Sequence, residues 1–241
     1  MSITVFQHDA DAAPGRLGSI LRDHAFKLDI CKIHDGDTPP VDYDDVDAVI
    51  SLGGAANVSE GHHWIAKECD YLKGAHDRGL PVLGVCLGAQ LVAHALGGTV
   101  AQMDSPEVGF PEVTLNGPSA HTDTMLSGVA WTSPQFSLHE AEVTELPPGG
   151  VVLASSERCR VQAFKVGMRT YGFQYHFEAT EPMIVRFAER MQPMLHRGGL
   201  TREEFAEQHT TRGEMFARLA DRLCENLATY WIPRVANAVR A

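Results

Sequence analysis

The 241-residue sequence has few cysteines and little positive charge, and each shortage excludes a class of protein. Its five cysteines are odd in number and form no CxxC pair, so neither a disulfide framework nor a cysteine-rich zinc site is predicted. The 20 Lys and Arg residues are outnumbered by 31 Asp and Glu residues, which gives a formal net charge of −11. Because a surface of that sign repels polyanions, nucleic acid is not expected as a partner.

Export signals and membrane spans are also missing. The start of the chain has Asp9 and Asp11 where a secretory signal would carry basic residues before an apolar stretch. Residues 79 to 103 carry no formal charge and are long enough to span a bilayer, but five glycines, Pro81 and Gln90 divide them. We therefore expect a cytoplasmic protein that does not bind a membrane.

Short β-rich runs alternate with helix-like stretches over the first hundred residues. This alternation predicts an α/β fold with a parallel sheet. At about 150 residues per domain, the length favours one domain or one domain with an appendage. The expected strands are residues 2 to 7, 28 to 33, 46 to 52 and 81 to 85, and the expected helices are about 15 to 26, 62 to 78 and 89 to 96.

The pattern changes twice further along the chain. From about residue 99 to 175, strand-sized pieces separated by glycine and proline indicate an additional mixed or antiparallel section. After residue 180 the apolar spacing is helical, with expected breaks near Gly213 and Pro233. Four side chains at that spacing are expected to pack in the core without a functional role: Met183, Phe187, Met191 and Met194.

One strand-to-helix junction has the pattern of a nucleophile. In the segment PVLGVCLGAQ, Cys86 stands between Gly84 and Gly88, after a buried strand and at the start of a helix. So sharp a turn needs glycines because Cβ atoms on either side would clash, and it presents the central side chain at the carboxyl edge of the sheet. The helix N-terminus also favours the thiolate. Cys86 is therefore predicted to be a nucleophile rather than a buried structural cysteine.

A thiolate nucleophile needs a base, and the base needs an orienting group. The segment YGFQYHFE offers both, because His176 follows a strand-like run and Glu178 lies two residues on, on the same side of an extended chain. We expect His176 to contact Cys86 and Glu178 to fix the imidazole ring. On its own, this segment would favour a histidine that merely packs at a strand end.

Backbone amides are the usual donors to the oxyanion that develops in acyl transfer. Two candidates are the amide of Leu87, after the nucleophile, and the loop LGGA, whose Gly53 and Gly54 allow close approach of a ligand. Without the other residues these glycines fit a plain βα turn equally well. Neither pattern of a phosphate-binding glycine loop occurs there, so a nucleotide site is not predicted.

Three motifs in this order resemble the class I glutamine amidotransferases: SLGGAANV, GVCLGAQ and YGFQYHFE. The resemblance runs from about residue 2 to 180, and the weaker matches PEVGF and FSLHEAEV point to the stand-alone branch similar to the amidotransferase domain of GMP synthase. It implies a flavodoxin-like fold with an open, mostly parallel sheet and flanking helices. We expect the catalytic domain over residues 1–180 and a C-terminal helical extension packed on it over residues 181–241.

The resemblance also implies the chemistry. Cys86 would attack a γ-carboxamide to give a γ-glutamyl thioester, His176 would protonate the departing ammonia, and Glu178 would orient His176. Water or an acceptor amine would then release the acyl group. The amides expected to form the oxyanion hole are those of Gly54 and Leu87. The residues expected to bind the substrate are Gly53, Gln90 and His139.

The chain departs from the family pattern in three places. Phe177 stands where a proline usually separates the catalytic His and Glu, and Ala55 stands where a proline usually follows the Gly-Gly pair. Residues 138 to 141 read Leu-His-Glu-Ala, where the family often has Trp-His-x-Asp. Because this last change falls at substrate recognition, the resemblance leaves the substrate open.

Two activities share the same candidate residues. One is ammonia supply to a synthetase partner, which this chain would need because it has no ATP-binding signature and no room for a second catalytic domain. The other is autonomous hydrolysis of γ-glutamyl compounds, which needs no partner and which the stand-alone length modestly favours.

Other hypotheses fit the sequence less well. A related superfamily of cysteine proteases normally has His directly after the nucleophile, where this chain has Leu87, and the intact Cys, His and Glu set argues against a catalytically silent binding protein. No cofactor is expected. No metal site is predicted, because His62 and His63 are adjacent and HExxH is absent. The C-terminal helices could cover the site or form a homodimer face.

Overall fold

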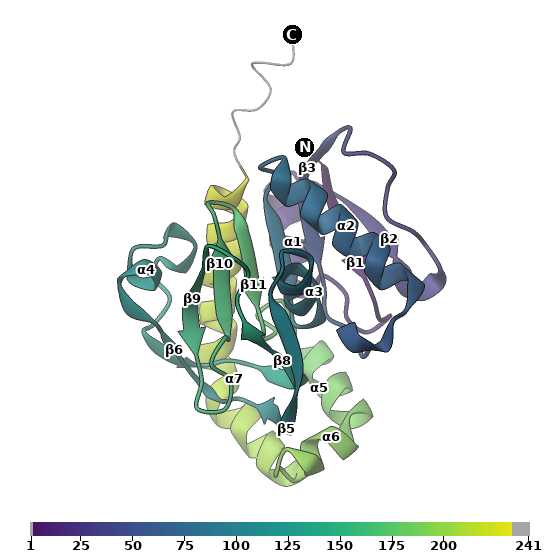
Figure 1. Ribbon diagram of the computed structural model, residues 1–241. Coiled ribbons are helices and arrows are strands. Elements are labelled where there is room, and N and C mark those ends of the chain that lie inside the picture. The colour runs from purple at the N-terminus through teal and green to yellow at the C-terminus, as the bar shows by residue number, and fades with distance from the viewer. Residues whose placement is uncertain (1, 233–241) are drawn as a thin grey trace.

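The computed structural model describes residues 2–232 and shows a large mixed sheet with helices on both faces (Figure 1). The strand order is β2-β1-β3-β4-β11-β10-β9-β6-β7. The first five strands in that order are parallel, and the others pair antiparallel. The strands are β1 (Ser2–Gln7), β2 (Lys27–Lys32), β3 (Val46–Ser51), β4 (Val82–Val85), β6 (Glu112–Leu115), β7 (Thr132–Pro134), β9 (Gly150–Ser155), β10 (Ala163–Val166) and β11 (Thr170–Phe173).

The start of this order is that of a flavodoxin-like sheet, so the predicted fold class is confirmed. The central strands β3 and β4 consist almost wholly of buried apolar residues, as expected for parallel strands covered on both faces. The predicted mixed section is also confirmed. It includes a second, two-stranded antiparallel sheet of β5 (Thr99–Gly109) and β8 (Ser137–Glu145).

Two apolar clusters separate the helices by the face that they cover. α2 and α3 pack with one cluster, whereas α1, α5, α6 and α7 pack with the other. The α-helices are α1 (Gly15–Asp23), α2 (His63–Asp77), α3 (Leu87–Ala95), α4 (Gly117–His121), α5 (Glu181–Arg190), α6 (Gln192–Arg197) and α7 (Arg202–Asn226). Single turns are η1 (Ile33–Asp35), η2 (Val58–Glu60), η3 (Thr124–Leu126) and the π-helical η4 (Leu227–Trp231).

The prediction of a helix break near Gly213 is wrong, because α7 runs through this residue without interruption. Thr201 and Glu204 form a capping box that fixes the start of the helix. Phe205 and Phe216, on either side of Gly213, are buried in the core. A single interior glycine costs only about 1 kcal/mol relative to alanine, which this burial outweighs. The break expected at Pro233 lies outside the described residues.

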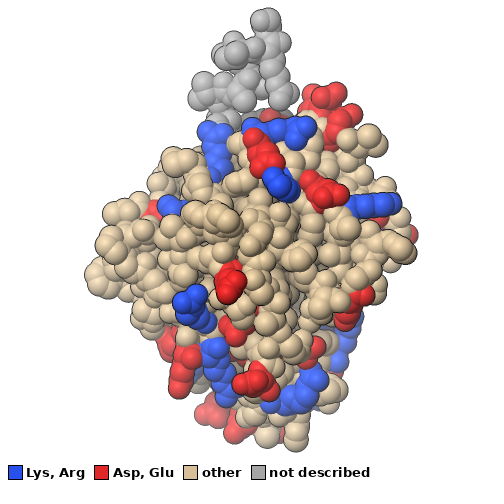
Figure 2. Space-filling model, viewed as in Figure 1, with Lys and Arg blue, Asp and Glu red and all other residues tan. Residues whose placement is uncertain are grey.

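Charged side chains of both signs are intermixed on the face seen in Figure 2, most of them toward its upper and lower ends, and uncharged surface covers much of the area between. None of the helices in the described part of the chain is both long and apolar enough to cross a membrane.

The strand-helix junctions that concern function lie at the carboxyl ends of β1, β3 and β4, which meet at one edge of the parallel sheet.

Candidate active site

Cys86 occupies the turn between β4 and α3 in a backbone conformation that L side chains seldom adopt. Its φ is +51° and its ψ is −111°, a region that persists only where the surroundings enforce it. Its amide donates to the carbonyl oxygen of Phe173 on β11 at 2.8 Å, and its carbonyl accepts from the Gln90 amide at 3.1 Å. The residue is 6% exposed. The fold therefore holds this cysteine at a strand-to-helix elbow, as predicted.

The two glycines beside Cys86 are required by contacts with backbone. A Cβ on Gly84 would lie 2.4 Å from the carbonyl oxygen of Gly88, inside the elbow itself. A Cβ on Gly88 would lie 1.9 Å from the carbonyl oxygen of Ser51, on the neighbouring strand β3. Neither carbonyl can move without disturbing a strand or the first turn of α3, so the spacing G-x-C-x-G has a steric cause.

Gly88→Ala is expected to lower the free energy of unfolding by about 3 kcal/mol, the upper part of the usual range for overpacking. The control is Gly213→Ala in α7, where the added Cβ would meet only the His209 ring at 3.0 Å and the change should stay below about 1 kcal/mol. Urea unfolding measures both. Equal losses at the two positions would contradict the steric account of the elbow.

His176 and Glu178 form a buried pair after β11. Nδ1 of His176 lies 2.7 Å from Oε1 of Glu178, and the two side chains are 6% and 1% exposed. Burial opposes a charged imidazole, but the Glu178 carboxylate and the hydrogen bond with Cys86 together hold the pKa of His176 well above its usual value. Because Nδ1 is engaged by Glu178, Nε2 is the ring atom left for Cys86. The structure thus brings the three predicted residues into contact, with His176 between Glu178 and Cys86.

Gly53 lies against both ends of this contact. A Cβ there would be 2.7 Å from Cε1 of His176 and 3.6 Å from Cβ of Cys86. The absence of a side chain at Gly53 is therefore what lets the imidazole approach the thiol from beside the loop after β3.

The Leu87 and Gly54 amides, which the sequence suggested as oxyanion donors, both belong to residues near the thiol. The Leu87 amide opens α3, so it has no acceptor within the helix, whereas the Gly88 amide donates to the carbonyl oxygen of Leu52 at 3.1 Å. Gly54 and Leu87 both line the pocket that Cys86 and His176 face. This placement fits the two amides that the sequence suggested.

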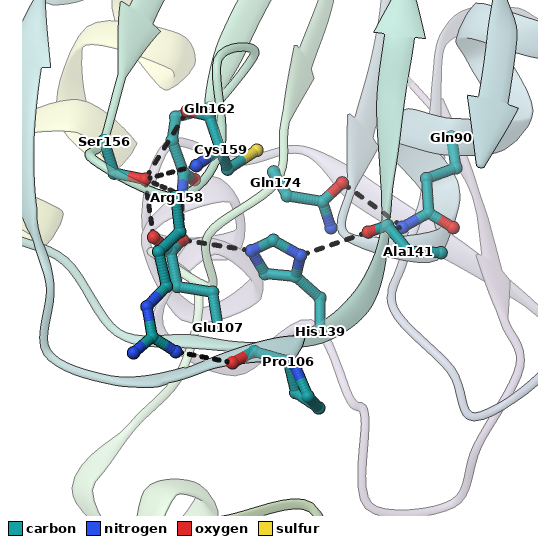
Figure 3. A network of polar contacts seen from close by, with 10 residues as sticks. All are labelled: Gln90, Pro106, Glu107, His139, Ala141, Ser156, Arg158, Cys159, Gln162 and Gln174. Carbon is teal, nitrogen blue, oxygen red and sulfur yellow. Dashed lines mark hydrogen bonds and ion pairs between the residues drawn. The ribbon is translucent and has the colours of Figure 1, made fainter. Parts of the chain in front are cut away.

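Gln90 and His139 belong to the wall of the same pocket. Nε2 of Gln90 donates to the carbonyl oxygen of Ala141 at 2.9 Å and to Oε1 of Gln174 at 3.2 Å (Figure 3). The His139 ring lies between the carbonyl oxygen of Ala141, 3.1 Å from Nδ1, and Oε2 of Glu107, 3.2 Å from Nε2. Both ring nitrogens thus face the protein rather than the pocket, and His139 contributes a fixed wall.

A buried network behind this wall holds His139 in place (Figure 3). Glu107 is 3% exposed and accepts from the hydroxyl of Ser156 at 2.5 Å and from Nε2 of Gln162. Glu107 belongs to the PEVGF segment that carried part of the resemblance, but nothing in the sequence assigned it a role. The signal that could have found it is a carboxylate between Pro106 and Val108, in the short apolar end of a strand that is otherwise polar.

The C-terminal helices contribute side chains to the pocket, a role that the sequence did not predict. Phe187, Met191 and Met194 line the pocket, whereas their helical spacing had indicated core packing alone. Phe187 and Met194 are indeed buried. The pocket encloses about 120 Å³, enough for several water-sized groups and hence for a small polar ligand.

Arg190 stands at the mouth of this pocket, held by two acids from the loop after β1. Its Nη1 donates to Asp9 and to Asp11, each at 2.8 Å, and its Nη2 donates to Asp9 at 2.5 Å. The bond from Arg190 lowers the pKa of Asp9 against the opposing effect of burial. Among the described residues, no other Lys or Arg lines the pocket.

No metal cluster accompanies these residues. Within residues 2–232, no group of three or more His, Cys, Asp and Glu side chains is placed to hold an ion. His62 lies at the start of α2, where its Nε2 is 2.9 Å from Oε2 of Glu60.

Fold and site together define a class: an α/β enzyme with a cysteine at a strand-to-helix elbow, paired with a histidine that a glutamate holds. Residues 18–182 match the family profile described as Glutamine amidotransferase class-I. The chain belongs to that family, as its three motifs predicted.

Individual relatives differ in how much of the chain they match. The glutamine-hydrolyzing GMP synthase subunit from Saccharolobus solfataricus is 37% identical over 55% of this chain and 67% of its own length. Gamma-glutamyl peptidase 4 of Arabidopsis thaliana is 27% identical over 86% of this chain and 84% of its own. The chain spans only 26% of the GMP synthase of Corynebacterium diphtheriae, at 35% identity.

A solved structure supports the fold over nearly the whole chain. The crystal structure of a glutamine amido transferase from Methylobacillus flagellatus has a TM-score of 0.83, with 22% identity and 93% of each chain covered. The C-terminal helices are therefore within the shared architecture.

Proposed function

We propose that this protein cleaves γ-glutamyl amide bonds, with Cys86 as the nucleophile, His176 as the acid and base, and Glu178 as the group that orients His176. The observation that carries this proposal is the buried line from Glu178 through His176 to the thiol at the elbow. Such an arrangement activates a thiol and supplies a proton to a leaving group in the same place.

The reaction would proceed in two steps. The Cys86 thiolate attacks the γ-carbonyl carbon, and the carbonyl oxygen becomes an oxyanion held by the amides of Gly54 and Leu87. The C–N bond then breaks as His176 gives its proton to the nitrogen, which leaves as ammonia or an amine. Water, giving a proton to His176, next attacks the γ-glutamyl thioester and releases glutamate and the thiol. Gln90 and His139 line the wall that the γ-glutamyl chain would follow, whereas Gly53 lies beside the His176 ring and is not part of the pocket lining.

Arg190 supports a substrate with a free α-carboxylate. A guanidinium has five N–H groups, and Asp9 and Asp11 take three of those of Arg190. The remaining Nε–H and one Nη2–H lie on the same edge of the group, a fork that fits a carboxylate with two hydrogen bonds.

We favour a free-standing hydrolase of γ-glutamyl compounds over an ammonia supplier. The likeness to a γ-glutamyl peptidase extends over most of both chains, whereas the likeness to the GMP synthase subunit of Saccharolobus solfataricus covers about half of this one. In this interpretation residues 1–180 form the catalytic domain, and α5 and α6 of the extension over residues 181–241 complete its pocket. Ammonia supply to a synthetase partner is the second candidate, on the higher identity to that GMP synthase subunit.

Glutamate release by the purified protein tests the proposal and separates its two forms. L-Glutamine and a panel of γ-glutamyl peptides and amines are offered, with Cys86→Ala as the control. Preference for a γ-glutamyl conjugate, without ATP or partner, is the expected result. Preference for L-glutamine would favour the amidotransferase form, and release that persists in Cys86→Ala would refute the proposed mechanism.

Arg190→Gln is expected to raise KM for L-glutamine by about 10- to 100-fold, the value of a charge-assisted hydrogen bond. The matched control is Arg186→Gln, one turn earlier on α5, whose guanidinium lies 3.6 Å from Asp11 and does not line the pocket. With 4-aminobutanamide, which lacks the α-carboxylate, the two variants should have the same KM. A KM for L-glutamine that Arg190→Gln leaves unchanged would remove the proposed contact.

A further inference from the structure

A second buried histidine and glutamate lie behind the loop that carries the candidate oxyanion donor. His8 follows β1 and Glu68 is on α2, and their side chains are 1% and 0% exposed. Nε2 of His8 lies 2.8 Å from Oε2 of Glu68, and Oε1 of Glu68 accepts from the Ser51 hydroxyl at 2.7 Å. The proposed chemistry uses none of these three side chains.

The other ring nitrogen of His8 points at the loop itself. Nδ1 lies 3.0 Å from the carbonyl oxygen of Leu52, and because a carbonyl can only accept, Nδ1 carries the proton and donates it. The same carbonyl accepts from the Gly88 amide at 3.1 Å, in the first turn after Cys86. The Leu52 carbonyl oxygen is therefore hydrogen-bonded both to His8 and to the first turn of α3 beside Cys86.

Contacts on the next residues show how closely the loop is held. A Cβ on Gly54 would lie 2.6 Å from Cβ of His8 and 3.1 Å from Cδ2 of Leu87. The space beside the Gly54 backbone is therefore filled by His8 and by the Leu87 side chain at the start of α3. The ring of Trp64 also packs on His8, with 5.0 Å between ring centroids, and helps to keep the imidazole away from water.

We propose that His8 is a positioning residue for the oxyanion hole: fixed by Glu68, it holds the Leu52 carbonyl and thereby the Gly54 amide at the distance that the reaction needs. This inference rests on the proposed function for its catalytic consequence. The structural part of the inference, that one hydrogen bond orders the loop, does not depend on the proposed function.

Two substitutions separate the two ring nitrogens. In His8→Asn the side-chain amide nitrogen replaces Nδ1, so the bond to Leu52 is kept and the contact with Glu68 is lost. In His8→Gln the amide nitrogen replaces Nε2, so Glu68 keeps a hydrogen-bonding partner and the Leu52 carbonyl loses its donor. His62→Ala serves as the control, because His62 stacks on Trp64 and bonds Glu60 rather than either of these groups.

We expect His8→Gln to lower kcat by about 10- to 100-fold, part of the effect of losing an oxyanion donor, with KM changed less than about threefold. His8→Asn should keep kcat within about threefold of the wild type, and His62→Ala should match the wild type. Thermal unfolding of each variant accompanies the kinetics. Rates that fall together in both His8 variants, or in proportion to their loss of stability, would show that His8 only fills space and would overturn the proposal.

Amide hydrogen exchange tests the loop independently of turnover. His8→Gln should speed exchange in the peptide that spans residues 51 to 56, and His8→Asn should not. If the wild type cleaves no γ-glutamyl compound, the proposed function fails while this measurement still decides the role of His8. Unchanged exchange in His8→Gln would refute the positioning role even in an active enzyme.

Discussion

Cys86→Ala is expected to abolish glutamate release, lowering kcat by about 10⁴-fold or more, because removal of a nucleophile leaves only binding and oxyanion stabilisation. The fold should survive. Alanine removes one sulfur atom and leaves the backbone with the same Cβ, so the strain of a φ of +51° is unchanged. Steady-state kinetics and urea unfolding of the same preparations check both parts.

Cys31→Ala is the matched control for this substitution. Burial, with smaller effects of Asp37 and Glu68, raises the pKa of the Cys31 thiol to about 11, so that it stays protonated at neutral pH. A thiol in that state is a poor nucleophile. Full activity in Cys31→Ala is expected, and equal losses in the two variants would remove the special status of Cys86.

Glu178→Gln is expected to lower kcat by about 10⁴-fold, comparable to the loss of the orienting carboxylate in other triads. The amide oxygen of the substituted side chain can still accept a hydrogen bond from the imidazole, but it offers no negative charge to a protonated His176. Glu181→Gln, three residues further on and exposed at the start of α5, is the control and should keep its activity.

The role of Glu178 also predicts the direction in which the pH profile of kcat/KM moves in Glu178→Gln. Burial opposes the charged imidazole, and the Glu178 carboxylate and Cys86 outweigh it and raise the pKa of His176. Removing the carboxylate charge lowers that pKa, so the high-pH limb of the kcat/KM profile should move to lower pH in Glu178→Gln. An unmoved limb, with kcat reduced, would mean that Glu178 acts only through packing.

Stability should follow the same linkage. Because the pKa of His176 is higher in the folded than in the unfolded protein, its charged form stabilises the fold fully below the unfolded value of about 6.5. That contribution to stability is lost as the pH rises through the raised pKa of His176 in the folded protein. The difference in unfolding free energy between the wild type and Glu178→Gln should therefore be largest near pH 6.5 and shrink as the pH rises from there.

The sequence could predict those parts of the site that short segments of the chain determine. The elbow at Cys86 needs glycines at two nearby positions, and His176 and Glu178 are neighbours on one extended segment, so local patterns were sufficient. The parallel strands followed from the same kind of pattern, because buried strands and amphipathic helices differ in period.

The parts that escaped prediction depend on contacts between distant segments. Arg190 reaches the pocket because Asp9, 181 residues earlier, accepts two of its hydrogen bonds. His8 and Glu68 are 60 residues apart, and neither stands in a motif. In α7, burial of Phe205 and Phe216 overrides the local preference of Gly213. Such pairings become visible only when the chain is folded.

Trapping the acyl-enzyme tests the central claim most directly. The protein is mixed with a γ-glutamyl substrate, quenched in acid during turnover, digested and analysed by mass spectrometry, with Cys86→Ala treated in parallel. We predict a γ-glutamyl adduct on the peptide that contains Cys86, removed by hydroxylamine as a thioester is, and absent from the variant. Turnover with no adduct on Cys86, or an adduct on another cysteine, would contradict the account.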